Sequence, residues 1–141
     1  MRPYCIGRFT REVDILTLIF GGAYQGKLAY ALEYFGLNNS EIYHCSNECV
    51  SVPGGKKIIY EIDRWILALI QADANITENV SKFTASNNDT IVICNDISCG
   101  IVPIDAKMRK WREETGRAMA VLARQSDEVI RLFCGIPSRV K

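Results

Sequence analysis

The stretch ILTLIFGGAYQGK, residues 15–27, joins a continuous apolar run to a glycine-rich segment, and it determines the expected fold. An uninterrupted apolar run is typical of a strand in a parallel sheet that is buried on both faces. Apolar residues then recur at helical spacing from Lys27 to Phe35, and Gly36 ends the pattern. We therefore predict a strand over Val13 to Phe20, a glycine loop, and a helix over Lys27 to Phe35.

The loop has the G-x-x-x-x-G-K spacing of a phosphate-binding loop. Glycines let backbone N–H groups close around a polyphosphate, the next helix directs its positive N-terminus toward it, and the lysine reaches the outer phosphates. Leu28 stands where Ser or Thr normally offers a hydroxyl to Mg²⁺. A glycine turn of purely structural use is the alternative. The predicted nucleotide-binding residues are Gly21, Gly22, Ala23, Tyr24, Gln25, Gly26, Lys27 and Leu28.

Strand and helix patterns alternate along the rest of the chain. Short apolar runs bounded by turn residues predict strands, and longer amphipathic stretches predict helices. The expected strands are Glu41 to Cys45, Ile58 to Ile62, Thr90 to Cys94 and Glu128 to Phe133, and the expected helices are Asp63 to about Phe83 and Pro103 to about Gln125. The expected fold class is α/β: a P-loop (RecA-like) three-layer fold with a mostly parallel sheet of about five strands and helices on both faces.

Length and composition fit one soluble domain over residues 1–141, with residues 1–11 as a loosely held N-terminal extension. The chain is 48% hydrophobic and 23% charged, which suffices for a real core. Its formal net charge of +1 gives no general attraction for nucleic acid or an anionic membrane, so an anion site must be local. Apolar stretches are too short to span a bilayer and the first ten residues lack the core of a secretion signal. We expect a cytoplasmic protein without nucleic-acid or membrane partners.

Six cysteines occur without a C-x-x-C pair, at positions 5, 45, 49, 94, 99 and 134. We interpret them as reduced thiols, because a chain of this size does not need disulfide cross-links. His44 is the only histidine, and with Cys45 and Cys49 it would supply at most three zinc ligands. A strand end passing into a loop is therefore the preferred interpretation of this segment.

Acidic residues follow two of the predicted strands. Glu61 and Asp63 end the segment IIYEID, and Asp96 ends IVICND. Ligand sites in open parallel sheets lie outside the carboxyl ends of the strands, so these carboxylates are candidates to orient Mg²⁺ between phosphates. The alternative for Glu61 and Asp63 is a solvated first helical turn, where acids suit the helix dipole. We predict Lys27, Glu61 and Asp96 as catalytic residues, with Glu61 and Asp96 as magnesium ligands.

The C-terminal third carries motifs in a characteristic order. Asn95-Asp96 is followed by Gly100-Ile101-Val102-Pro103, by Arg109-Lys110-Trp111-Arg112-Glu113 with Gly116, by Asp127-Glu128-Val129 and by Gly135-Ile136-Pro137. This arrangement resembles the closing part of the adenosylcobinamide kinase/adenosylcobinamide-phosphate guanylyltransferase family of cobalamin biosynthesis. The glycine loop resembles that family's Gly-Gly-x-x-x-Gly-Lys-Ser, and IIYEIDRW resembles its strand ending in an acid, with Glu61 at the acidic position. We expect a short and divergent member.

The resemblance implies a P-loop enzyme that uses GTP or ATP to phosphorylate the aminopropanol hydroxyl of adenosylcobinamide, and then transfers GMP to that phosphate through a guanylylated histidine. It also implies a corrinoid substrate and a homo-oligomer such as a trimer. Leu28 removes the loop hydroxyl, Ile104 replaces an acid, and Met119-Ala120 replace a polar pair. The segment CSNECVSVPGGKK, residues 45–57, is shortened and has no histidine, and His44 does not match the family's motif. We therefore expect guanylyl transfer to be lost, because it needs a nucleophile.

Three functions stay open. The first is a short member of the family that binds GTP or ATP with Mg²⁺ and retains at most kinase activity. The second is a catalytically degenerate nucleotide-binding or regulatory protein of the same fold. The third is an unrelated small P-loop kinase that acts on a different alcohol.

The predicted long helix has one apolar stripe and several basic residues. Met108, Trp111, Thr115, Met119 and Leu122 recur at spacings of three and four, so we interpret Trp111 as part of the core. The resemblance makes Arg109 and Arg112 candidates for phosphate or subunit contacts.

Overall fold

The computed structural model describes residues 15–98 and 101–141, so the predicted N-terminal extension, Cys5, Cys99 and Gly100 lie outside the described residues. Strands and helices alternate, as the sequence predicts. In chain order the elements are β1 (Thr17–Gly21), α1 (Lys27–Phe35), a 3₁₀ turn (Asn39–Glu41), β2 (Ile42–His44), β3 (Ile58–Tyr60), α2 (Ile62–Gln71), α3 (Ile76–Ser86), β4 (Ile91–Asn95), α4 (Ala106–Gln125), β5 (Glu128–Phe133) and β6 (Ile136–Arg139).

The strands of the described chain form one six-stranded sheet in the order β2-β3-β4-β1-β5-β6. The pairs among β1 to β5 are parallel, whereas β6 runs antiparallel to β5. β1 lies between β4 and β5, and its last residue, Gly21, is opposite Asn95 of β4. The prediction of a mostly parallel α/β sheet is confirmed, with one strand more than expected.

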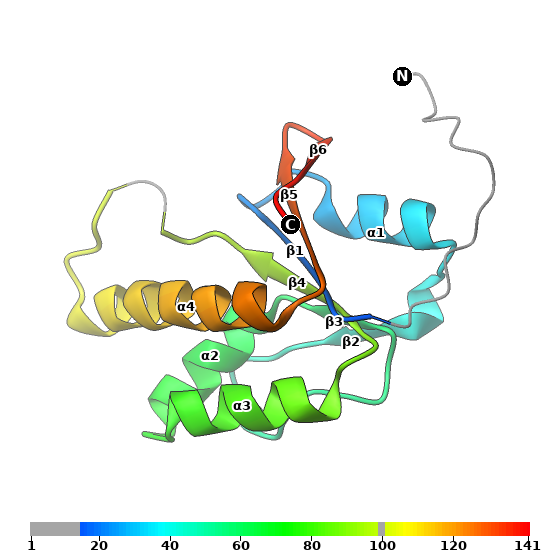
Figure 1. Ribbon diagram of the computed structural model, residues 1–141. Coiled ribbons are helices and arrows are strands. Elements are labelled where there is room, and N and C mark those ends of the chain that lie inside the picture. The colour runs from blue at the N-terminus through cyan, green and yellow to red at the C-terminus, as the bar shows by residue number, and fades with distance from the viewer. Residues whose placement is uncertain (1–14, 99–100) are drawn as a thin grey trace.

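Helices cover both faces of the sheet, which confirms the three-layer arrangement (Figure 1). On one face α1 packs its buried Ala31 and Phe35 against isoleucines of the central strands. On the other face α2, α3 and α4 enclose a larger core, in which the rings of Trp65 and Phe83 lie 5.7 Å apart. Burial of such aromatic side chains removes a large apolar area from water and holds this layer against the sheet.

The prediction of one helix from Asp63 to about Phe83 was wrong, because two helices occupy this segment. α2 ends at Gln71, and Asp73 then adopts a left-handed backbone with φ of 54°. Asn75 starts α3 as its N-cap, its side chain accepting a hydrogen bond from the backbone N–H of Glu78 at 3.0 Å. Apolar residues on both sides of the break pack against the same core, so their spacing concealed the turn.

The C-terminal strand β6 was not predicted. It forms a hairpin with β5 through Cys134 and Gly135, which both have positive φ. Its residues are mostly exposed and include Pro137, so it lacks the alternation that marks a half-buried strand. The other strands differ from the predicted bounds by a few residues at their ends; β3, for example, ends at Tyr60.

The long helix α4 begins at Ala106, three residues after Pro103. Asp105 is its N-cap and accepts hydrogen bonds from the backbone N–H groups of Lys107 and Met108, at 2.7 and 3.2 Å. The predicted apolar stripe faces α2 and α3, with Thr115 and Leu122 fully buried. None of the helices in the described residues combines the length and the apolar character of a membrane span.

Candidate functional site

Three segments meet at the carboxyl edge of the sheet. The glycine loop (residues 21–28) follows β1, the start of α2 follows β3, and residues 95–98 follow β4. The backbone N–H of Asp96 donates to the carbonyl oxygen of Gly21 at 2.8 Å, which ties the exit of β4 to the loop. Two adjoining cavities open here, and both are bordered by Ala23, Arg64 and Asn95.

The larger cavity, with a volume of about 440 Å³, lies over the glycine loop. Six predicted loop residues border it, Ala23 to Leu28, whereas Gly21 and Gly22 do not. Its charged residues are Lys27, Arg64 and the predicted catalytic Glu61. Lys27 and Arg64 bring two cations to this cavity, and an anion site needs such local charges in a chain of nearly neutral net charge.

Lys27 begins α1 and bends back over the loop. Its Nζ donates a hydrogen bond to the carbonyl oxygen of Gly22 at 2.7 Å, and the residue is only 5% exposed. Burial lowers the pKa of Lys27, and the carboxylate of Asp63 partly opposes this shift. The fold therefore holds a poorly hydrated ammonium group at the start of a helix, where burial disfavours its charged form.

Two non-glycine residues with left-handed backbones border the larger cavity. Tyr24, at the tip of the loop and fully exposed, has φ of 60°, and Glu61, which immediately precedes α2, has φ of 59°. Gly26, with φ of 84°, adopts the same region without a side chain to strain it. Strained backbone of this kind concentrates at functional sites, where the surrounding structure maintains it.

The turn between β5 and β6 is hydrogen-bonded to the glycine loop. The side-chain Oε1 of Gln25 accepts a hydrogen bond from the backbone N–H of Cys134, and the N–H of Gly135 donates to the carbonyl oxygen of Gln25 at 3.1 Å. Gly21 lies directly against the carbonyl oxygen of Leu132 in β5. The unpredicted strand β6 therefore contributes to the site, because its turn fixes the loop's outer end.

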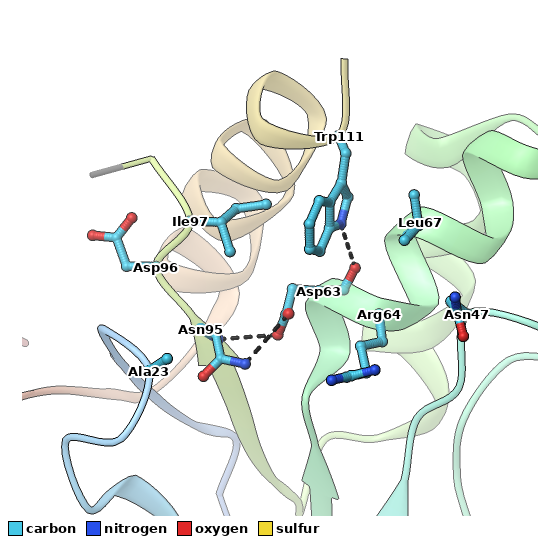
Figure 2. A pocket seen from close by; sticks show the side chains of 9 residues that line it. All are labelled: Ala23, Asn47, Asp63, Arg64, Leu67, Asn95, Asp96, Ile97 and Trp111. Atoms are coloured by element: carbon cyan, nitrogen blue, oxygen red, sulfur yellow. Dashed lines mark hydrogen bonds between the residues drawn. The ribbon is translucent and has the colours of Figure 1, made fainter. Parts of the chain in front are cut away.

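The smaller cavity, of about 280 Å³, lies between the loop, the start of α2 and α4 (Figure 2). The predicted catalytic residue Asp96 borders it, as does Trp111. Trp111 is half-buried and packs against the core, as expected, but its ring also borders the cavity. The residues around this cavity are Ala23, Asn47, Asp63, Arg64, Leu67, Asn95, Asp96, Ile97 and Trp111.

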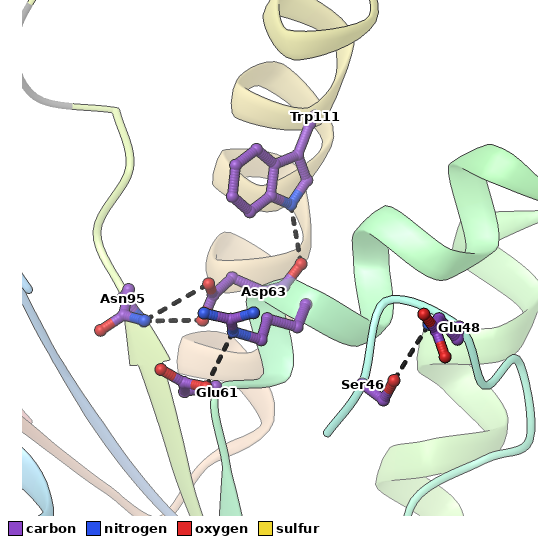
Figure 3. Close-up of polar contacts among 7 residues, drawn as sticks. Ser46, Glu48, Glu61, Asp63, Asn95 and Trp111 are labelled. Carbon is purple, nitrogen blue, oxygen red and sulfur yellow. Dashed lines mark hydrogen bonds and ion pairs between the residues drawn. The ribbon is translucent and has the colours of Figure 1, made fainter. Parts of the chain in front are cut away.

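Asp63 joins α2 to the end of β4 and to α4 (Figure 3). Its carboxylate accepts hydrogen bonds from the backbone N–H of Asn95 at 3.0 Å and from Asn95 Nδ2 at 3.4 Å, while its carbonyl oxygen accepts from Trp111 Nε1 at 2.7 Å. The residue is 2% exposed, and burial raises the pKa of its carboxyl group although the Asn95 hydrogen bonds oppose the shift. Asp63 therefore links three elements that border the site: α2, the end of β4 and α4.

We expect Asp63→Asn to stabilise the protein at neutral pH. Because the pKa of Asp63 is raised, the folded state holds the proton to a higher pH than the unfolded chain does. The free energy of unfolding that Asp63 contributes therefore falls as the pH rises from the ordinary aspartate pKa to the raised one. Asparagine keeps an oxygen to accept from the backbone N–H of Asn95, loses only the longer hydrogen bond from Asn95 Nδ2, and removes the buried charge. Thermal unfolding against pH should show a gain at pH 7 that vanishes in acid. The exposed Glu33→Gln on α1 is the control, and a loss at pH 7 would contradict the argument.

Glu61 and Asp96 each have a partner. Glu61 Oε2 lies 2.8 Å from Arg64 Nε, and Asp96 Oδ1 accepts hydrogen bonds from the backbone N–H of Ser98 at 3.0 Å and from its hydroxyl. The two predicted magnesium ligands border different cavities, and the Leu28 side chain, which borders the larger one, offers no oxygen. Within residues 15–98 and 101–141, no group of three or more His, Cys, Asp or Glu side chains is arranged to hold a metal ion. The loop cavity offers one carboxylate, that of Glu61, and this group is already paired with Arg64.

Other candidates from the sequence take structural positions. Arg109 donates to the carbonyl oxygen of Pro103 at 3.2 Å and Arg112 to that of Ser98, so both arginines hold the segment that precedes α4. His44 is exposed at the end of β2 and its ring makes an edge contact with Tyr60, with centroids 5.5 Å apart. Burial raises the pKa of the Cys45 thiol to about 12, which keeps it protonated and unreactive at neutral pH.

Arg64 and Asn47 border the cavities but were not predicted as site residues, and no role was predicted for Asn95. Asn95 was visible in the Asn-Asp pair after β4, but nothing in the sequence indicated that its side chain would bind Asp63. The signal for Arg64 was its position three residues after Glu61, which is an ion-pair spacing on a helix.

Comparison with known proteins identifies the family. A model of the family described as cobinamide kinase / cobinamide phosphate guanyltransferase matches residues 48–140, about two thirds of the chain. The matched segment contains Glu61, Asp63, Asn95, Asp96 and α4, whereas the glycine loop lies before it. No curated protein shows significant similarity to the chain. The chain belongs to the cobinamide kinase / cobinamide phosphate guanyltransferase family.

Proposed function

We propose that this chain binds GTP or ATP in the larger cavity, with the glycine loop acting as a P-loop, and that it retains at most the kinase half of the family's chemistry. The observation that carries the proposal is the buried ammonium of Lys27, held over the loop at the start of α1. The helix N-terminus and the cations Lys27 and Arg64 favour a polyphosphate at the same place.

Phosphoryl transfer requires positioning and charge stabilisation more than covalent chemistry, which suits the residues present. The γ-phosphate of a nucleotide over the loop would lie near the boundary that both cavities share, at Ala23 and Asn95. An alcohol in the smaller cavity would place its hydroxyl near Asp96, which we propose as its hydrogen-bond acceptor. A cavity of about 280 Å³ accommodates the aminopropanol arm of a corrinoid, while the macrocycle would remain outside.

We propose that guanylyl transfer is absent. GMP transfer through the protein needs a nucleophilic side chain at the α-phosphate, and the segment that carries the family's histidine is shortened here and contains none. His44 is exposed beside Tyr60 and stays unassigned.

A catalytically degenerate nucleotide-binding protein is the second candidate. Leu28 in place of the loop hydroxyl and the Glu61–Arg64 ion pair favour it, because both reduce the oxygen ligands available to a metal. We propose a cytoplasmic homo-oligomer in either case. Exposed apolar side chains on the β5–β6 hairpin, at Phe133 and Ile136, and just after it, at Val140, support self-association.

Calorimetric titration with GTP, ATP, GDP and guanosine tests the proposal. We expect the triphosphates to bind at least tenfold more tightly than guanosine, because most of the binding free energy comes from charged hydrogen bonds to phosphate. Absence of binding by every nucleotide would refute it. Incubation of the same protein with ATP and cobinamide then separates the two candidates: formation of cobinamide phosphate supports the kinase, and binding without product supports the degenerate protein.

A further inference from the structure

Arg64 occupies the boundary between the two cavities. It is on the first turn of α2, and its side chain, 52% exposed, borders both the loop cavity and the smaller cavity. Figure 2 shows it among the residues around the smaller cavity. Its ion pair with Glu61 uses Nε, so the two terminal nitrogens of the guanidinium bring four further N–H donors to this boundary. A phosphate that extends from the loop toward Asn95 would meet these donors.

The same place lacks the usual provision for a metal ion. A P-loop normally presents a hydroxyl to Mg²⁺ immediately after the lysine, and Leu28 presents an apolar side chain to the loop cavity instead. The carboxylate at the end of β3, that of Glu61, already has a cation at 2.8 Å. A magnesium ion at Glu61 would therefore have to share its carboxylate with Arg64, beside a second positive charge, and would still lack the loop ligand.

We infer that Arg64 replaces the protein-held metal ion: together with Lys27 it neutralises the phosphates of a bound nucleoside triphosphate, so that binding does not require Mg²⁺. A guanidinium is permanently charged and its planar fork matches two phosphate oxygens, which makes it a suitable substitute for a divalent cation. Glu61 positions the side chain through the ion pair without occupying the terminal nitrogens. This inference rests on the proposed nucleotide site.

Titration of the full chain with ATP and with GTP, once in excess Mg²⁺ and once in EDTA, tests the inference. We expect the two dissociation constants of the unmodified protein to agree within about twofold. Arg64→Gln, which keeps a polar N–H donor on a shorter side chain and loses the charge, should weaken binding in EDTA by roughly tenfold or more. The double variant Leu28→Ser/Arg64→Gln restores the hydroxyl and frees Glu61, so it should bind the nucleotide in a Mg²⁺-dependent manner.

Arg117→Gln is the matched control, since Arg117 pairs with Glu113 and Glu114 on α4 away from both cavities. It should leave both dissociation constants unchanged. Tenfold tighter binding in Mg²⁺ than in EDTA by the unmodified protein, or an Arg64→Gln variant that binds normally, would overturn the inference while leaving the nucleotide site intact. Failure of the unmodified protein to bind under both conditions would remove the nucleotide site itself, and the role of Arg64 with it.

Discussion

Replacement of Lys27 by methionine should weaken the binding of GTP or ATP by roughly 100-fold, which makes it the largest functional effect we expect from one substitution. The ammonium is buried at the start of α1 and directed over the loop, so a phosphate oxygen there would exchange its hydrogen bonds with water for a charged one in a poorly hydrated cavity. Calorimetry with the two triphosphates measures the change. Methionine keeps the apolar stem of the side chain, so the packing around α1 is preserved.

The same substitution should leave the free energy of unfolding unchanged or raise it. Burial lowers the pKa of Lys27, which means that the folded state disfavours the charged form, and methionine removes that cost. The hydrogen bond to Gly22 is lost, which offsets part of the gain. A residue that weakens the fold and strengthens ligand binding is the expected signature of a functional site.

Lys110→Met on the exposed face of α4 is the control, because it removes an equal charge far from the loop. It should change neither nucleotide affinity nor unfolding temperature appreciably. Guanosine, which has no phosphate, should bind the Lys27 variant as weakly as it binds the unmodified protein. If Lys27→Met instead unfolded the protein while the residual folded fraction bound GTP normally, Lys27 would be a structural residue and the assignment of the loop would be wrong.

The fold was largely predictable because most of its elements have local signals. The run before the glycine loop is apolar except for Thr17, which is buried with its neighbours, and Gly36 ends α1 at its predicted bound with a left-handed backbone. The break between α2 and α3 was not predictable from apolar spacing, because Ile70 and Ile76 contact one core across it. β6 was missed because its stability comes from pairing with β5 and from few buried side chains of its own.

The sequence indicated which segments form the site, but it did not indicate how their side chains are arranged. Parallel strands bring Lys27, Glu61 and Asp96 to one edge of the sheet, but whether they share a cavity depends on the backbone between them. The left-handed turn at Glu61 separates the two acids of IIYEID, leaving Glu61 beside the loop cavity and burying Asp63 against Asn95. Glutamate seldom adopts this conformation, so no sequence pattern indicates the turn.

Gly21→Ala should destabilise the fold by about 3 kcal/mol, the largest effect on stability that we expect from adding one methyl group. A Cβ at this position would lie 2.3 Å from the carbonyl oxygen of Leu132, well inside contact distance. That oxygen belongs to β5, which is fixed between β1 and β6, and the Leu132 side chain is buried in the core, so the neighbour cannot yield without moving the sheet. Denaturant unfolding measures the loss as a lower midpoint.

Gly116→Ala on α4 makes the same chemical change where nothing lies within 4 Å of the added Cβ, and it should stabilise the protein by about 0.5–1 kcal/mol through helix propensity. The Cβ of Gly22→Ala would make an ordinary 3.6 Å contact with the Gln25 side chain. Its effect on the free energy of unfolding should therefore lie between those of Gly21→Ala and Gly116→Ala. If Gly21→Ala and Gly22→Ala lowered the free energy of unfolding equally, the loop itself, and not the contact with β5, would require glycine at both positions. The Gly21 carbonyl also accepts the Asp96 N–H, so a shifted Gly21→Ala backbone should weaken GTP binding as well.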